Sequence, residues 1–209
     1  TFEVLADDFE AIRGELGVDQ VAVLGHSILG VLAIEYGRLR PGSVSHVIVA
    51  GTPPSGDMAS LAAKSSAFFE EHASEERKQL LHDNLANLSE GASMGETMYA
   101  QTPMRFYDAR FDAAPLFAEA DSKPGLLKHI MGTLTPSWTI LAETSSLRVP
   151  IFIAQGRHDY TVPYVLWDGV VDALPNATLR LFEKSGHQPF FEEPEVFAEA
   201  LSKWMAEQG

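Results

Sequence analysis

Residues 21–30 read Val-Ala-Val-Leu-Gly-His-Ser-Ile-Leu-Gly. The apolar run at the start, rich in β-branched valine, predicts a buried β-strand. A Gly-x-Ser turn follows it, and residues 28–40 then predict a helix that Pro41-Gly42 would end. The stretch therefore predicts a strand, a sharp turn that carries a serine, and a helix.

This order of elements is typical of a nucleophile elbow. The elbow lifts the hydroxyl of Ser27 clear of the sheet. It also directs the backbone N–H of Ile28 at the oxyanion that forms when a serine attacks a carbonyl group. The usual pattern has glycine two residues after the serine, where this chain has Leu29, and glycine comes one residue later, at Gly30. We expect this departure to shift how the helix packs under the elbow.

Composition limits the classes of function. A chain of 209 residues with 45% apolar residues can form one large domain, or a domain with a sizeable insertion. The net charge of −14 argues against nucleic acid and anionic lipid as partners, because both need a basic face. The lack of cysteine excludes a disulfide framework and suits the reducing cytoplasm, where we expect the protein to act. We expect neither a signal peptide nor a membrane span, since no apolar stretch approaches 18 residues.

Strands alternate with helices on both sides of the turn at Ser27. The sequence predicts further strands over 44–50, 149–155 and 177–182, and helices over 3–16, 163–174 and 194–207. Alternation of this kind predicts βαβ units and an α/β fold with a parallel sheet.

Residues 57–147 break this alternation, because they contain no convincing strand. Residues 59–72 predict a helix, and Ser74 predicts the cap of a second helix whose first turn carries two glutamates. We interpret 57–147 as a helical cap that lies over the carboxyl edge of the sheet, and 1–56 with 148–209 as the core domain. The methionines and aromatic residues of this segment are most simply the core of the cap.

Two later loops supply partners for the serine. A serine nucleophile needs a base that accepts its proton and a third group that orients the base. Asp159 follows the strand at 149–155, and His187 follows the strand at 177–182. We therefore expect His187 to be the general base and Asp159 the acid. Asp159 could otherwise serve only as a helix N-cap.

The remaining histidines have other expected roles. His158 precedes the acid and has no role that faces the serine, and His26 is expected to pack and to form hydrogen bonds. Neither a metal site nor a cofactor is predicted, because no carboxylate or histidine lies at ligand spacing from His46, His72, His82 and His129.

Five further motifs complete a resemblance that covers nearly the whole chain: Gly-Thr-Pro-Pro at 51–54, Gly-Arg-His-Asp-Tyr at 156–160, Leu-Trp-Asp-Gly at 166–169, Ser-Gly-His at 185–187 and Glu-Glu-Pro at 192–194. With the elbow, they resemble the α/β-hydrolase fold superfamily, and within it the proline iminopeptidase-like branch with a helical cap. The resemblance implies a Ser-acid-His triad in that chain order. It carries Ser27 over as nucleophile, Asp159 as acid and His187 as base.

The resemblance also implies a sheet of eight strands, of which the chain contains the last four. A second oxyanion N–H, which the family supplies from a loop after an early strand, has no counterpart here. The strand at 21–24 is apolar on both faces, as interior strands are. We therefore expect an N-terminal segment or a second chain to complete the sheet beside it.

These observations favour a serine hydrolase that cleaves a small ester, lactone or amide through an acyl-enzyme intermediate. Cleavage at the N-terminus of a peptide, as by an aminopeptidase for proline, needs carboxylates that hold an amine; the candidates are Glu70, Glu71, Glu96 and Glu119. A ligand-binding protein without catalysis is the alternative from another class, because a fold does not fix a function.

Overall fold

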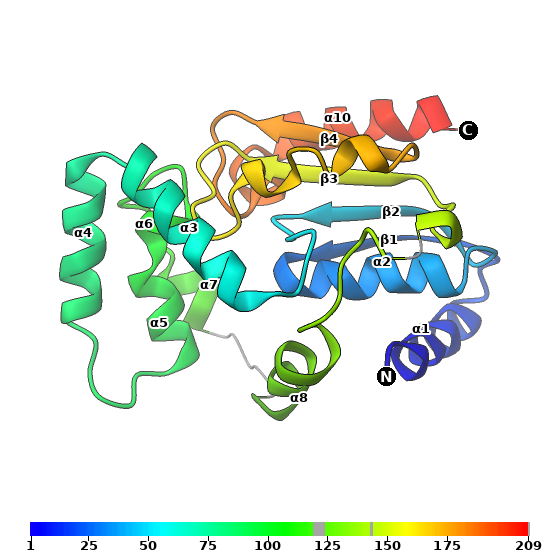
Figure 1. Cartoon of the computed structure of the whole chain (residues 1–209), viewed down its shortest axis with the longest axis horizontal. Helices are drawn as coiled ribbons and strands as arrows, with labels where there is room; N and C mark the ends of the chain where they lie inside the picture. Colours follow the sequence, from blue (N-terminus) through cyan, green and yellow to red (C-terminus); the bar gives the residue numbers. More distant parts are fainter. Residues whose placement is uncertain (119–123, 143, 209) are drawn as a thin grey trace.

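Four parallel strands form one sheet in the order β1-β2-β3-β4, which confirms the predicted α/β class (Figure 1). This computed structural model describes residues 1–118, 124–142 and 144–208. The strands are β1 (Val21–His26), β2 (Val44–Ala50), β3 (Ile151–Gly156) and β4 (Ala177–Phe182). β2 and β4 have the predicted bounds, and β3 begins two residues later than predicted.

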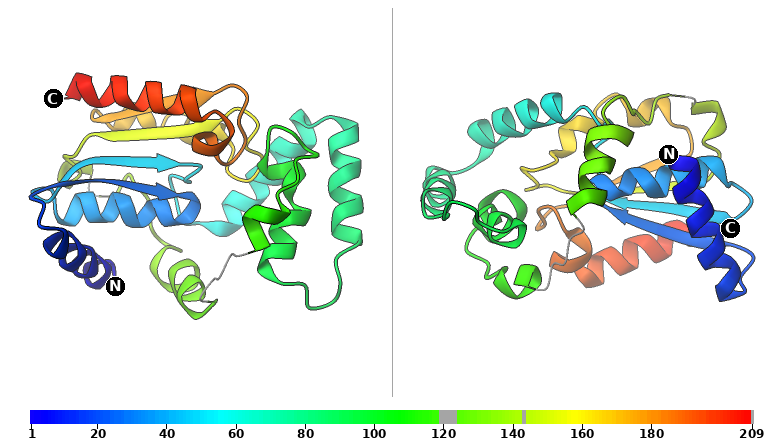
Figure 2. Two further views of the ribbon diagram at one scale, coloured as in Figure 1. Left: turned by 180° about the vertical axis from the view of Figure 1, so that it is seen from behind. Right: turned by 90° about the horizontal axis from the view of Figure 1, so that it is seen from below.

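Each face of the sheet is covered by its own layer of helices (Figure 2). Side chains alternate along β2, so that Val47 and Val49 face α2 (Gly30–Leu39), while Ile48 faces α10 (Pro194–Gln208). Helix α1 (Phe2–Leu16) packs on α2. Burial of a valine side chain of this kind stabilises the fold by about 1.5–3 kcal/mol. The two apolar layers hold the sheet in place. Because all four strands are parallel, their carboxyl ends lie at one edge of the sheet, where the predicted site residues follow them.

Strand β1 lies at the edge of the sheet, and among the described residues it pairs only with β2. Its side chains are not buried on both faces, since Ala22 and Leu24 are exposed. Val21 and Val23 pack on the core that α2 covers. The expectation that a further segment or a second chain pairs with β1 stays a prediction.

The prediction of one helix over 163–174 was wrong. The structure has two short 3-10 turns there, η4 (Tyr164–Trp167) and η5 (Val171–Ala173). Asp168 between them is extended, with ψ 126°, and Gly169 has φ +72°. A left-handed glycine after an extended residue cannot continue a helix.

Two other helical turns differ from the expected pattern. The helix predicted from residue 28 begins with a 3-10 turn, η1 (Ser27–Leu29), before α2. A short helix, α9 (Pro189–Glu192), follows the His187 loop and was not predicted.

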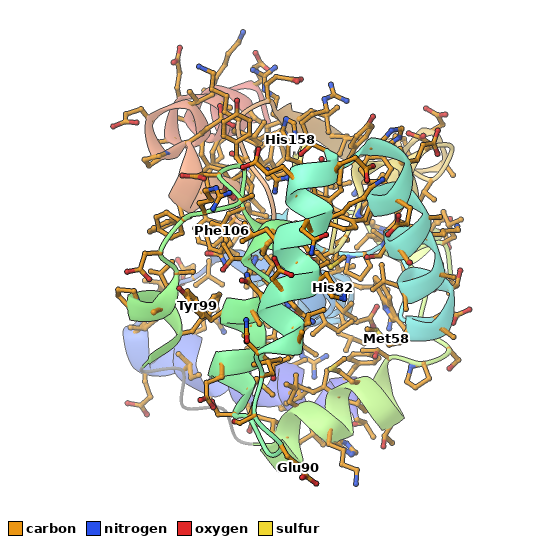
Figure 3. The ribbon with its side chains drawn as sticks, turned by 90° about the vertical axis from the view of Figure 1, so that its left-hand side faces the viewer. Met58, His82, Glu90, Tyr99, Phe106 and His158 are labelled. Atoms are coloured by element: carbon orange, nitrogen blue, oxygen red, sulfur yellow. The ribbon has the colours of Figure 1, made fainter. Side chains whose placement is uncertain are left out.

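Residues 57–147 contain helices and no named strand in the part that the structure describes. The segment lies mostly beyond the carboxyl ends of the strands, and Figure 3 views this end with Met58, His82 and Tyr99 labelled. Its elements are α3 (Met58–His72), α4 (Glu75–Ala86), α5 (Met94–Ala100), α6 (Thr102–Arg105), α7 (Ala114–Ala118), α8 (Pro124–His129) and the π-helical turn η2 (Ile130–Leu134); η3 (Thr144–Ser146) follows near its end. Ser74 caps α4 as predicted, since its Oγ accepts from Arg77 N.

Buried polar contacts attach this helical segment to the rest of the molecule. Trp138 donates its indole N–H to the carboxylate of Glu35 on α2 over 2.9 Å. Ser65 on α3 donates to the carbonyl oxygen of Tyr160 over 2.5 Å. Such bonds have fixed donors and acceptors, so they set the position of the segment over the sheet. The division into a core and a cap at 57–147 stays a prediction.

None of the helices in the described ranges is both long enough and apolar enough to cross a membrane.

Candidate active site

Ser27 sits at the turn between β1 and α2 with φ +56°, the one positive φ of a non-glycine residue in the described chain. This left-handed conformation is strained for serine and is typical of a nucleophile elbow. The backbones of Gly25 and Gly30 approach each other closely in this turn. A Cβ added to Gly25 would lie only 2.5 Å from the Cα of Gly30. Gly30 therefore makes the close approach, and Leu29 is accommodated because its side chain is 46% exposed.

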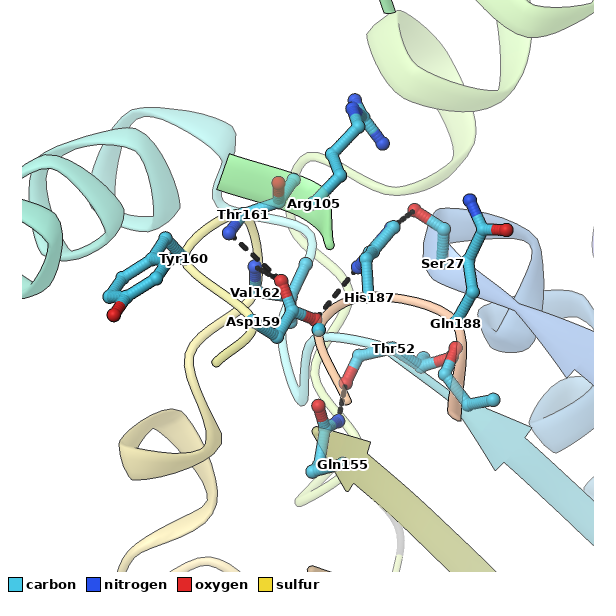
Figure 4. Close-up of polar contacts among 12 residues, drawn as sticks. Ser27, Thr52, Arg105, Gln155, Asp159, Tyr160, Thr161, Val162, His187 and Gln188 are labelled. Atoms are coloured by element: carbon cyan, nitrogen blue, oxygen red, sulfur yellow. Dashed lines mark hydrogen bonds and ion pairs between the residues drawn. The ribbon is translucent and has the colours of Figure 1, made fainter. Parts of the chain in front are cut away.

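The structure brings Ser27, His187 and Asp159 into one chain of hydrogen bonds (Figure 4). The Ser27 hydroxyl lies 3.0 Å from His187 Nε2, and His187 Nδ1 lies 2.7 Å from Asp159 Oδ2. A neutral imidazole that donates from Nδ1 to the carboxylate presents Nε2 as the acceptor for the serine proton. The side chains of His187 and Asp159 are fully buried, while Ser27 is half-buried. Water therefore does not compete for the hydrogen bond between His187 and Asp159.

Asp159 is oriented by the loop after β3. Its Oδ1 accepts the backbone N–H groups of Thr161 and Val162, each over 2.8 Å, which leaves Oδ2 for the histidine. The carboxylate thus accepts N–H groups two and three residues later, as an N-cap residue does, and it also binds His187.

The loop of His187 is held by Glu192 of α9. Glu192 accepts the backbone N–H groups of Tyr107, Gly186 and Gln188. Burial raises the pKa of Glu192 to about 7, against the lowering effect of these three bonds. The backbone N–H of His187 itself donates to the carbonyl oxygen of Arg105 over 2.6 Å. The position of His187 therefore depends on the helical segment as well as on the sheet.

His26 has the packing and hydrogen-bonding role expected for it. Its ring lies 4.7 Å from that of His187 and 5.3 Å from that of Phe190, and its Nε2–H donates to the carbonyl oxygen of His187. Burial lowers the pKa of His26 to about 3, with a further contribution from the charge of His187. His26 is therefore neutral and packs against His187. His158 stays outside the chain of bonds, with its ring against Tyr107.

Sequence reasoning missed Arg105 and the role of Glu192. Each has a weak signal in the sequence. Arg105 is a single cation in the apolar run Met104-Arg-Phe-Tyr107, and Glu192 comes five residues after the predicted base. Neither signal identifies a partner, because both contacts join segments that are 80 or more residues apart.

The other described candidates form no hydrogen bond or ion pair with Ser27, Asp159 or His187. Glu70 and Glu71 are exposed, and Glu96 is exposed and closes the capping box of α5. Glu119 lies outside the described residues. The described residues contain no group of three histidines or carboxylates that could hold a metal ion.

A family model described as alpha/beta hydrolase fold matches residues 1–194. The AB hydrolase superfamily protein YclE of Bacillus subtilis is 34% identical over 97% of this chain and 74% of its own length. A proline iminopeptidase of Clostridium botulinum is 27% identical over 93% of this chain and 69% of its own length. The crystal structure of a proline iminopeptidase from Mycobacterium smegmatis has the same fold, with a TM-score of 0.74, 20% identity, and coverage of 100% of this chain and 72% of that one.

Proposed function

The chain belongs to the α/β-hydrolase fold family, and from that premise we propose that it is a serine hydrolase of small esters or amides. In this proposal Ser27 is the nucleophile, His187 the general base and Asp159 the acid that orients the imidazole. The observation that supports it is the continuous chain of hydrogen bonds from Ser27 Oγ through His187 to Asp159. The strained φ of Ser27 in the elbow agrees with it.

The reaction follows from the order of these bonds. Ser27 Oγ attacks the carbonyl carbon of the substrate while its proton passes to His187 Nε2. The imidazolium that forms is stabilised by Asp159. His187 then gives the proton to the leaving alcohol or amine as the bond between carbon and leaving group breaks. Water then attacks the acyl-enzyme while its proton passes to His187. His187 returns that proton to Ser27 Oγ as the acyl bond breaks, which releases the acid and the free serine.

Ile28 is the proposed donor to the oxyanion. Its backbone N–H lies in the first helical turn after Ser27, where N–H groups have no intrahelical acceptor. An N–H at this place can stabilise the negative oxygen of the tetrahedral intermediate.

Labelling with a fluorophosphonate tests this function. The wild-type protein should gain one covalent adduct on Ser27, because the probe reports an activated serine and its base. Ser27→Ala should gain none, and Ser89→Ala should be labelled like the wild type, since Ser89 is an exposed loop residue. A folded protein that is not labelled would contradict the proposal and favour a binding protein without catalysis.

A proline-type aminopeptidase is the second candidate, because relatives with that name are 26–27% identical to this chain. Prolyl-naphthylamide measured against short p-nitrophenyl esters separates the two candidates. A higher kcat/KM for the amide would favour the aminopeptidase, and a higher kcat/KM for the esters the esterase.

A further inference from the structure

Arg105 is a half-buried cation that forms no ion pair with any carboxylate of the described residues. It is the last residue of α6, and its side chain is half-buried. Its Nη2 donates to the amide oxygen of Gln101 over 3.1 Å, while its Nε is fully buried and has no hydrogen-bond partner. No carboxylate of the described residues lies within ion-pair distance of its guanidinium. A guanidinium with one neutral acceptor leaves most of its five N–H donors unused.

Other arginines of the molecule are satisfied in a different way. Arg77, which is also half-buried, donates to three carbonyl oxygens of residues 103–107. Arg157 pairs with Glu183 over 2.9 Å and lies over the ring of Tyr164. Burial lowers the pKa of Arg105, although an arginine keeps its proton. A cation removed from water in this way gains much from an anion that enters beside it.

The position of Arg105 relates it to the reacting atoms. In Figure 4 its side chain lies on the side of the His187 ring away from the strands. The charge of Arg105 contributes to the lowered pKa of His26, and the charge of Asp159 partly offsets the lowering of the pKa of Arg105 by burial. Both His26 and Asp159 form hydrogen bonds with His187. The carbonyl oxygen of Arg105 also accepts the backbone N–H of His187 over 2.6 Å, so Arg105 adjoins the residue that contacts Ser27.

We propose that Arg105 binds a carboxylate of the substrate, so that the preferred substrates are small esters or amides with a carboxylate near the scissile carbonyl group. The inference rests on the proposed function and names its substrate class. The planar fork of arginine matches a carboxylate in two parallel hydrogen bonds, which a neutral ester cannot form as strongly. The same cation repels an α-ammonium group, which disfavours the aminopeptidase candidate.

A second role for Arg105 would be to stabilise the charge of Asp159 from a distance. This role acts on the triad and not on the substrate. Loss of Arg105 would then slow every substrate by the same factor. Preference between a charged and a neutral substrate therefore separates the two roles.

The test uses matched pairs of esters. One pair is p-nitrophenyl hydrogen glutarate and p-nitrophenyl pentanoate, which have acyl chains of equal length and differ in the terminal carboxylate. The other pair is 4-(butanoyloxy)benzoate and its methyl ester, which carry the difference on the leaving group. The wild type should prefer the carboxylate member of at least one pair by about 10- to 100-fold in kcat/KM, the range for a charge-assisted bond.

Three variants complete the design. Arg105→Gln should abolish the preference, chiefly through a higher KM for the anionic ester, while Arg105→Lys, which keeps the charge, should retain part of it. Arg110→Gln is the matched control, because Arg110 is an exposed arginine of the same helical segment that pairs with Glu76. It should leave the preference unchanged.

The outcomes keep this inference separate from the proposed function. A wild type that prefers the neutral member of both pairs would overturn the inference, as would an Arg105→Gln variant that slows both members of a pair equally. Fluorophosphonate labelling of Ser27 in the same samples would then still support the hydrolase. Absence of both labelling and hydrolysis would overturn the proposed function, and this inference with it.

Discussion

Replacement of Gly51 by alanine is the most direct test of how the base is positioned. Gly51 follows β2 with φ +56° and lies against the proposed base. A Cβ at this position would lie 2.7 Å from the carbonyl oxygen of His187 and 2.8 Å from its Nδ1. Both atoms belong to the residue that joins Ser27 to Asp159, so the methyl group must displace either the His187 loop or the turn at Gly51.

The expected effects have two parts. A non-glycine residue in the left-handed region costs roughly 1–2 kcal/mol, and crowding of a packed interior adds about 1–3 kcal/mol. The shorter contact falls about 0.7 Å below the 3.4 Å at which ordinary contact begins. Since misplacement of a reacting group by 1 Å can cost on the order of 100-fold in rate, we expect kcat/KM to fall roughly 10- to 100-fold.

Gly169→Ala is the matched control. Gly169 has φ +72°, but a Cβ there would meet nothing within 4 Å. It therefore measures the backbone strain alone. Urea unfolding and hydrolysis of p-nitrophenyl butyrate should show both variants destabilised and only Gly51→Ala slowed. A Gly51→Ala protein with wild-type kcat/KM would refute the view that the place of His187 limits the reaction.

Two further predictions concern groups that hold the base. Glu192→Gln should lower the free energy of unfolding by about 1–3 kcal/mol, because one of three backbone N–H groups would then face an amide NH₂. The pKa of Glu192 is raised from 4.5 to about 7, so its contribution to the free energy of unfolding is lost as the pH rises from 4.5 to 7. Urea unfolding should therefore show a larger difference in that free energy between wild type and variant at pH 5 than at pH 8. His26→Phe should keep the ring packing, slow fluorophosphonate labelling and lower stability, because the carbonyl oxygen of His187 loses its donor. The pKa of His26 is lowered from 6.5 to about 3. The free energy of unfolding of the wild type, measured in urea, should therefore exceed that of the variant by less as the pH falls below 6.5. A difference that stays constant with pH would contradict a neutral His26.

The sheet could be predicted from the sequence because its strands are short apolar runs between turn residues. Val44–Ala50 and Ala177–Phe182 have the predicted bounds for this reason. The prediction of a helix over 163–174 was wrong, because the spacing of apolar residues carries no information on the left-handed conformation that Gly169 adopts. Elements with local signals were thus placed correctly, and the break in the helical path at Asp168 and Gly169 was not.

The candidate site shows the same division. That Ser27, Asp159 and His187 lie together could be predicted because each follows a strand, and parallel strands bring their carboxyl ends to one edge. Arg105 and Glu192 could not be found, because their contacts depend on how the helical segment folds back on the His187 loop. That packing follows from side-chain shape and not from a pattern along the chain.

The contacts between the helical segment and the His187 loop have a consequence for turnover. Arg77 attaches α4 to residues 103–107, and the same stretch binds the loop through Arg105 O and Tyr107 N. A motion that lifts this stretch away from the His187 loop breaks the bond between His187 N and Arg105 O and the bond between Tyr107 N and Glu192. If the proposed function holds, a molecule opened at this side holds His187 less firmly, so we expect exchange of ligand by this route to alternate with bond cleavage.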